Sequence, residues 1–278
     1  MSSTYTGTPN LVTSITIPSD GDAAIANSVN VSSKALFDMQ AFLLQTYGQQ
    51  QQSTSPIKCY TLVDRVVLSP IPLVIMTETA IWKSYFKATD TTILSSKVEG
   101  GGGVFAHNVW YYLYAFSNAG SLDFQYSLTP PDSYNLYKND GTFAFKYITA
   151  VRTNNFGQLL ELNKYGNFVS SFNGNGLGSS TATTVESTLN TSTSLPPYKT
   201  TPTPVTLQIQ VTGTTAVSNT LYIKSVAGST GIAFPLGTAL NYSFQVQTIT
   251  DPTQRLYWQC GFTDLTTTIN FSIVSYYE

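Results

Sequence analysis

The chain has 278 residues, and its 13 Lys and Arg against 15 Asp and Glu give a formal net charge of -2. Proteins that bind nucleic acids carry a concentrated basic face, so this sparse and balanced charge argues against a nucleic-acid partner. Apolar residues make up 42% of the chain and aromatic residues 13%, a composition that can bury a core and is unlike that of a disordered chain.

Residues 1–55 predict an extended segment, a helix and a linker, and they are expected to serve in attachment or oligomerisation. Apolar side chains recur at helical spacing over residues 34–47, and they place Leu36, Met39 and Leu43 on one face. A glycine follows this pattern and can end the helix. A polar stretch that ends in proline then reads as the linker.

Residues 56–278 predict strands without a further helix. Short runs of β-branched and aromatic residues alternate with turn residues, and in residues 205–211 apolar and polar side chains alternate strictly. The expected fold class is therefore mainly β, an antiparallel, jelly-roll-like β-sandwich preceded by the short N-terminal α-helix. The stretch 173–204 is rich in Gly, Ser, Thr and Pro, and it is either a boundary between two β-domains or a crossover within one sandwich. We favour one sandwich, because each half alone is short of strands.

Residues 110–116 read WYYLYAF, and they pose a choice between an aromatic ligand shelf and the inside of a sheet. Side chains of a strand alternate between its faces, and here both faces are apolar, as expected of a strand covered on both sides. Gly120 can supply the positive φ of a hairpin turn after this strand. We therefore predict a core strand. Buried tyrosine and tryptophan keep a polar handle, so we expect Tyr111, Tyr114 and Trp258 at a rim or subunit interface.

No group of residues in the sequence specifies a reaction. His107 is the single histidine, and Cys59 and Cys260 are far apart, so these residue types offer no zinc-binding spacing. Both cysteines lie in apolar surroundings, and we predict two buried free thiols in preference to a disulfide. The carboxylates nearest to one another fit turns and strand ends better than a glycosidase pair. We predict a protein that is not an enzyme and has no cofactor and no metal site.

The N-terminal residues lack the basic and apolar regions of a signal peptide. No apolar run reaches the roughly 20 residues that a membrane-spanning helix needs. We therefore expect synthesis in the cytosol and no membrane insertion, and release by cell lysis is compatible with this.

Two stretches resemble virion proteins of tailed bacteriophages. Residues 15–44, ITIPSDGDAAIANSVNVSSKALFDMQAFLL, match an N-terminal pattern of a PxDGD turn, a small-residue segment and a helix. Residues 110–162 resemble a β-domain of fibre- and spike-like proteins, in which an aromatic strand, a Gly turn, S-x-x-P and a YK-x-x-G turn precede another strand. That last strand commonly reads Arg-Tyr-Leu-Gly, and this chain departs from it with Lys-Tyr-Ile-Thr at residues 146–149.

The resemblance implies an oligomeric tail, fibre or other appendage component located in the virion, beside other virion proteins. It would contribute to host attachment through a host-surface glycan or protein. Fibre-like proteins are commonly trimers, so three helices could bundle around Leu36, Met39 and Leu43; the alternative is a helix packed on its own β-domain.

Other functions stay open at this point. One is a purely structural capsid-decoration, neck or joining protein. A bacterial lectin or a pore-forming toxin is less favoured, since an export signal is missing.

Overall fold

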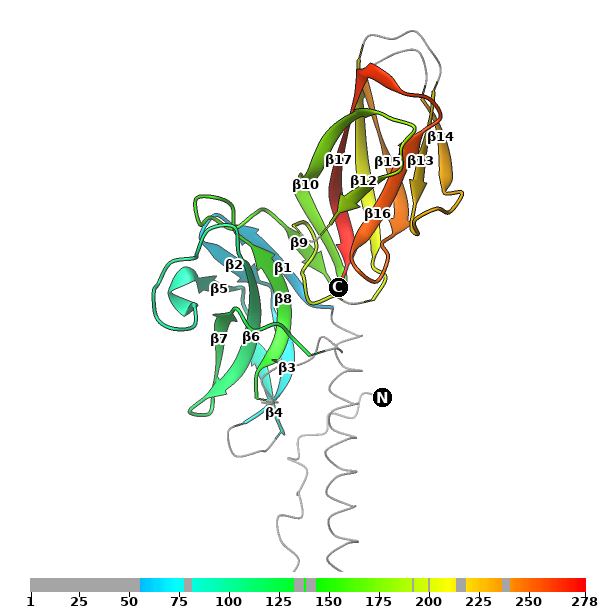
Figure 1. The fold of residues 1–278 in the computed structure, drawn as a ribbon. Helices are drawn as coiled ribbons and strands as arrows, with labels where there is room; N and C mark the ends of the chain where they lie inside the picture. Colours follow the sequence, from blue (N-terminus) through cyan, green and yellow to red (C-terminus); the bar gives the residue numbers. More distant parts are fainter. Residues whose placement is uncertain are drawn as a thin grey trace, which may run out of the picture. The chain divides into compact units, whose positions relative to one another are not determined.

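The computed structural model describes residues 56–77, 82–132, 138, 144–191, 193–199, 201–213, 219–236 and 241–278 (Figure 1). The chain divides into two compact units, Met1–Gln51 and Gln52–Glu278, and every described residue belongs to the second. The helix predicted over residues 34–47 lies outside the described residues.

The described unit is mainly β, as the sequence predicts, and every strand pairing within it is antiparallel. Its one helical element is a short 3-10 turn, η1 (Ser95–Lys97). The strands are β1 (Lys58–Leu62), β2 (Arg65–Leu68), β3 (Ile71–Met76), β4 (Trp82–Lys87), β5 (Thr91–Leu94), β6 (Trp110–Asn118), β7 (Ser121–Ser127), β8 (Lys146–Arg152), β9 (Asn163–Tyr165), β10 (Phe168–Ala182), β11 (Ser187–Asn190), β12 (Pro204–Thr212), β13 (Asn219–Lys224), β14 (Ile232–Leu236), β15 (Asn241–Ile249), β16 (Arg255–Cys260) and β17 (Asp264–Tyr277).

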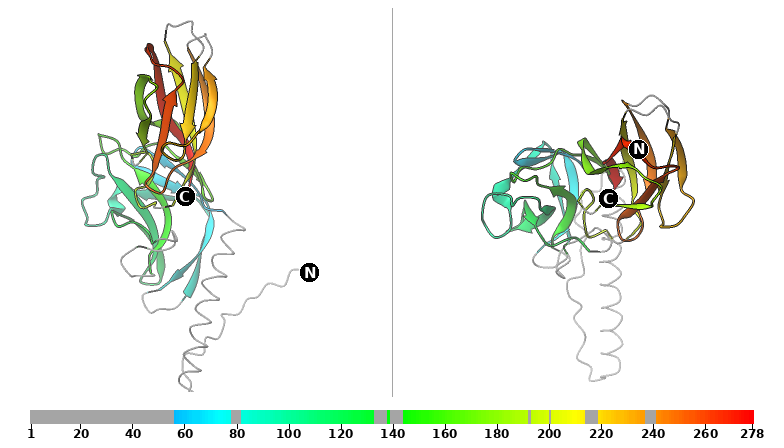
Figure 2. Two further views of the ribbon diagram at one scale, coloured as in Figure 1. Left: turned by 45° about the vertical axis from the view of Figure 1, so that its right-hand side comes forward. Right: turned by 45° about the horizontal axis from the view of Figure 1, so that its top comes forward.

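One long sheet connects strands from the whole described unit. Its order is β15-β12-β17-β10-β9-β1-β2-β5, so β1 and β17, from the two ends of the described sequence, belong to the same sheet with β9 and β10 between them (Figure 1, Figure 2). The other sheets of the described residues are β11-β16-β13-β14, β7-β6-β8 and β3-β4. The Gly-, Ser-, Thr- and Pro-rich stretch 173–204 contains the second half of β10 and all of β11. It therefore supplies strands to the long sheet and to the four-stranded sheet.

The four-stranded sheet packs face to face on one end of the long sheet. Trp258 of β16 lies against Phe271 of β17 with a ring-centroid separation of 5.1 Å, and both side chains are fully buried. Phe234 of β14 contacts Phe244 of β15 at 5.6 Å. Aromatic side chains thus fill the space between the two layers, which is how two inward faces of antiparallel sheets form one core.

The three-stranded sheet packs near the other end of the long sheet. The buried hydroxyl of Tyr126 in β7 donates a hydrogen bond to the Ile93 carbonyl at 2.8 Å and accepts one from the Val66 amide at 3.2 Å. The ring of Phe105 stands edge-on to Tyr126 at 5.0 Å. A tyrosine with a satisfied hydroxyl therefore joins these sheets inside the core.

Strand β6 is covered on both faces, which confirms the prediction for WYYLYAF. Tyr111 and Leu113 lie in the main core, whereas Tyr112 and Tyr114 lie in a second buried cluster on the opposite face. The hairpin to β7 turns at residues 119–120, and both have positive φ, 47° and 80°. That backbone is typical of a type I′ turn, so the predicted role of the glycine is also confirmed.

Candidate functional site

The residues that the sequence singles out do not form a site. Tyr111, Tyr114 and Trp258 are only 3%, 0% and 1% exposed, so they are core residues and do not lie at a rim of this unit. Their burial follows from the two covered faces of β6 and from the packing of β16 on the long sheet. Leu36, Met39 and Leu43 lie outside the described residues.

Three exposed aromatic side chains lie next to one another on the long sheet. Tyr165 of β9 is opposite Phe168 of β10, and Phe168 is opposite Tyr277 of β17. Their side chains are 57%, 37% and 52% exposed. Lys58 of β1 is opposite Tyr165, and its Nζ lies 4.9 Å from the centre of that ring. We call these four residues the aromatic row.

Strand alternation explains why the row faces outward. Side chains next to one another along a strand point to opposite faces, and directly opposite residues of paired strands share a face. Lys164, Val169 and Tyr276 each adjoin a member of the row in the chain, and all three are buried. The row is thus the outer side of strands whose inner side packs into the core.

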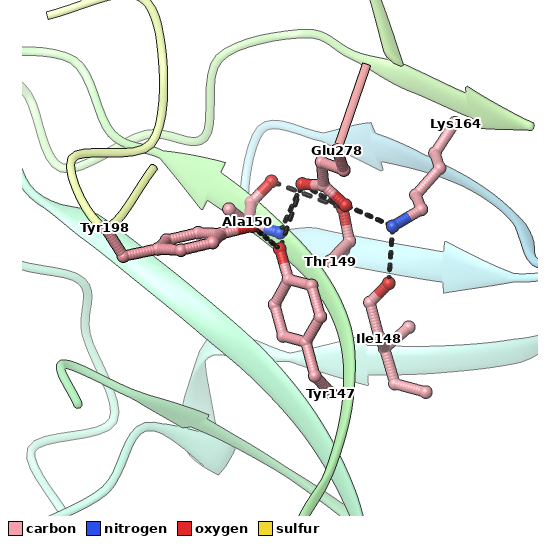
Figure 3. A network of polar contacts seen from close by, with 7 residues as sticks. All are labelled: Tyr147, Ile148, Thr149, Ala150, Lys164, Tyr198 and Glu278. Atoms are coloured by element: carbon pink, nitrogen blue, oxygen red, sulfur yellow. Dashed lines mark hydrogen bonds and ion pairs between the residues drawn. The ribbon is translucent and has the colours of Figure 1, made fainter. Parts of the chain in front are cut away.

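A buried network of polar contacts anchors strand β9, which carries Tyr165, and the residue that follows Tyr277 (Figure 3). Lys164 and Glu278 form an ion pair in which the side chains are 5% and 2% exposed. The Lys164 ammonium also donates to the Ile148 carbonyl at 2.7 Å. The ion pair therefore fixes β9 and the residue after β17 from beneath the sheet.

The carboxylate of Glu278 has further donors in this network. Its Oε1 accepts hydrogen bonds from the Tyr147 hydroxyl and from the Ala150 amide, each at 3.0 Å. The Tyr198 hydroxyl lies 3.2 Å from that of Tyr147. A buried carboxylate with several donors and a cation beside it is stabilised, so this network is suited to holding structure in place.

The network lacks an activated nucleophile. Burial raises the pKa of the adjacent Cys59 thiol to about 12, the opposite of the lowered pKa that makes a thiolate reactive. Burial, and then the charge of Glu278, also raise the pKa of Tyr147 well above its ordinary value. Both cysteines, Cys59 and Cys260, are buried free thiols, which confirms the sequence prediction.

Among the described residues no cluster of three or more His, Cys, Asp and Glu could hold a metal ion. His107 is an exposed turn residue. In the same part of the chain, no helix has the length and apolar character required to span a membrane.

Sequence reasoning missed the aromatic row, because its members come from four strands and their register decides that they meet. The sequence does hold a local signal, because Phe168 precedes the buried Val169 in β10 and Tyr277 follows the buried Tyr276 in β17. It shows which side chains share a face of one strand, and it carries no information about the neighbouring strand.

Comparisons with known proteins add little. No protein-family model matches the chain, and no curated protein matches it. One solved structure with some similarity comes from work on the promiscuous specificity of carbohydrate-binding modules of the β-sandwich superfamily. The match covers 81% of this chain and 99% of that chain, at 12% identity and a TM-score of 0.22. A similarity of that size carries no argument about what this chain binds.

Proposed function

We propose that this chain is a structural protein of a tailed-bacteriophage virion, a tail- or fibre-type appendage component that contributes to host attachment. The resemblance of residues 15–44 and 110–162 to such proteins supports the virion assignment. The observation that carries the attachment role is the aromatic row, an exposed apolar surface on a sheet that is anchored from below.

The aromatic row has the chemistry to bind a saccharide of the host surface. Monomeric proteins seldom leave adjoining large apolar side chains exposed, so such a surface indicates a binding site. Tyrosine rings offer an apolar face to the C–H groups of a sugar and a hydroxyl to its oxygens. A nucleic acid is a less suitable ligand, because the stacking of its bases is normally accompanied by a basic groove. The chain has a net charge of -2, and the row contains one lysine.

We also propose the finer architecture. The β unit is a jelly-roll-like antiparallel sandwich, the helix over residues 34–47 precedes it, and three copies of the chain bundle around Leu36, Met39 and Leu43. An isolated helix of this length is marginal in water, so association would stabilise it.

The virion assignment is tested by mass spectrometry and immunolabelling of purified particles. Presence of the chain at a tail or appendage supports it, and absence from purified particles refutes it. The trimer is tested by light scattering on the full chain. Leu36→Asp with Leu43→Asp should lower the particle mass to that of one chain, and an unchanged mass refutes the bundle.

The attachment surface is tested by binding of purified protein to susceptible cells. Tyr165→Ala with Tyr277→Ala should weaken binding at least tenfold, because both stacking rings are lost. Phe156→Ala is the matched control, since Phe156 is 72% exposed and does not belong to the row. Equal binding by all three proteins would show that the row is not the attachment surface. If no binding is detected across susceptible strains, the alternative of a capsid-decoration, neck or joining protein without a host ligand is favoured.

A further inference from the structure

Strand β15 forms one edge of the long sheet. It pairs with β12 along all nine of its residues, without a register shift. On its other side β15 has no neighbouring strand among the described residues, which also give it no backbone hydrogen bond outside the ladder with β12. Alternate residues of an edge strand in an antiparallel sheet direct their N–H and C=O groups away from the ladder. β15 therefore presents a regular row of backbone donors and acceptors with which another strand can pair.

The other edge strands of the described residues have features that hinder such pairing. Natural sheets protect their edges with proline, with charged side chains or with a very short edge strand. β5 and β11 have four residues each. The longer edge strands contain a proline or a charged residue, namely Pro72 in β3, Lys83 in β4, Asp123 in β7, Arg152 in β8 and Pro235 in β14. β15 contains neither, so it is the unprotected edge among the described strands.

The side chains of β15 suit a partner strand that has the same pattern. On the inner face of the sheet Phe244 is half-buried and Val246 is buried. The exposed residues of the outer face are all uncharged: Asn241, Ser243, Gln245, Gln247 and Ile249. A strand that extends this sheet must likewise alternate between solvent-facing and core-facing side chains. β15 itself meets that requirement, so a second copy of the chain carries a suitable partner strand.

We propose that β15 pairs in antiparallel orientation with β15 of a second copy, in the register that places Gln245 opposite the partner's Gln245. All nine residues are then paired. Phe244 lies opposite the partner's Val246, and an aromatic and a β-branched side chain form a favourable cross-strand pair. No like charges meet, because the strand is uncharged. A shift by one residue would place core-facing side chains of one copy opposite exposed side chains of the other, so the alternation disfavours it.

The pairing closes after two copies. Two identical antiparallel strands are related by a two-fold axis, and each copy then has its β15 edge covered. A single strand pair buries little surface, so the association is weak and becomes visible only as the protein concentration is raised. Dilute protein keeps the mass that its N-terminal residues set. The proposal rests on neither the virion assignment nor the aromatic row.

The test is light scattering on the full chain over a series from low-micromolar to near-millimolar concentration. The mass of wild type should rise toward twice its dilute value. Gln245→Lys and Gln245→Glu should each keep the dilute mass, because two like charges would lie opposite one another. An equimolar mixture of the two variants should recover the rise, because a lysine then lies opposite a glutamate.

Gln210→Lys is the matched control. Gln210 is exposed in the adjacent strand β12, opposite Ser243 and therefore on the same outer face, but it does not lie at the edge. Its variant should keep the rise of wild type. Hydrogen exchange of the β15 backbone amides is a second measurement, and it should slow with concentration in wild type and in the mixture but not in Gln245→Lys alone.

Three outcomes overturn the proposal. A constant mass throughout the series shows that β15 does not pair with a second copy, and protection of β15 in purified particles would then indicate a strand of another protein. An equal rise in wild type and in both Gln245 variants places the contact elsewhere. A rise that is lost in Tyr165→Ala with Tyr277→Ala, but kept in Gln245→Lys, identifies the aromatic row as the contact. Urea unfolding of each variant checks that the fold is intact.

Discussion

Lys164 and Glu278 form a buried ion pair that joins β9 to the residue following β17, 114 residues apart in the chain. Removing two charges from water is costly, and the attraction between them offsets this only when the remaining polar groups are also satisfied. Here Glu278 accepts from Tyr147 and from the Ala150 amide, and Lys164 donates to a carbonyl.

Glu278→Gln is expected to destabilise the unit by about 3–5 kcal/mol, because it leaves the Lys164 ammonium buried without its counter-charge. Urea unfolding measures the free energy of unfolding. Glu186→Gln is the control, since Glu186 pairs with Lys224 at 2.7 Å but is 26% exposed, and a smaller loss is expected. An equal loss in both variants would show that burial of the Lys164–Glu278 pair is not what matters.

Lys146 gives a pH dependence with a definite sign. Burial lowers the pKa of its ammonium from 10.5 to about 8. Between these values the unfolded chain binds more protons than the folded one, so this residue makes stability rise as pH rises from about 8 toward 10. Below pH 8 the charged, buried form costs as much as about 3 kcal/mol.

Lys146→Met should remove that cost, and it should gain most over wild type below pH 8. The measurement is urea unfolding of both proteins at several pH values. The wild type and the variant must be compared at each pH. The buried Cys and Tyr groups have raised pKa values, so they make the protein less stable at high pH and oppose the effect of Lys146. A constant difference between the proteins from pH 7 to 10 would contradict the prediction.

The two thiols are expected to be inert in the folded protein. Burial raises the pKa of Cys59 to about 12 and that of Cys260 to about 11, and the thiolate is the reactive form. A thiol reagent at pH 8 should label neither cysteine in native protein and both in guanidinium chloride. Fast labelling of the native protein would show that the core around them opens readily.

Substitutions of two glycines in the turn between β13 and β14 can distinguish the cost of backbone strain from the cost of a steric clash. Gly228 and Gly231 have nearly the same φ, +72° and +71°. A Cβ at Gly228 would meet nothing within 4 Å, whereas at Gly231 it would lie 2.6 Å from Lys224 Cγ and 2.7 Å from the Ile223 carbonyl oxygen.

Gly228→Ala should therefore cost about 1–2 kcal/mol, the cost of a left-handed backbone at a residue with a side chain. Gly231→Ala should cost clearly more, because the added methyl group displaces the backbone of β13. Thermal and urea unfolding provide the comparison. Similar losses would mean that the turn relaxes around the new methyl group.

Local patterns in the sequence predicted much of the fold. Alternating side chains over residues 205–211 predicted β12, whose burial alternates in the same way. Apolar residues on both faces of WYYLYAF predicted the doubly covered β6, and the apolar surroundings of Cys59 and Cys260 predicted buried free thiols. These features depend on a few consecutive residues, and a strand's two-residue period is visible at that range.

Residues far apart in the sequence meet only through tertiary structure. Strand periodicity assigns Trp258 to a face of β16, and only the packing of one sheet on another decides that this face is covered. The aromatic row and the Lys164–Glu278 pair each join strands that are far apart in the chain. Their partners are chosen by long-range strand pairing and by burial of the core, because no local period specifies which strand lies beside which.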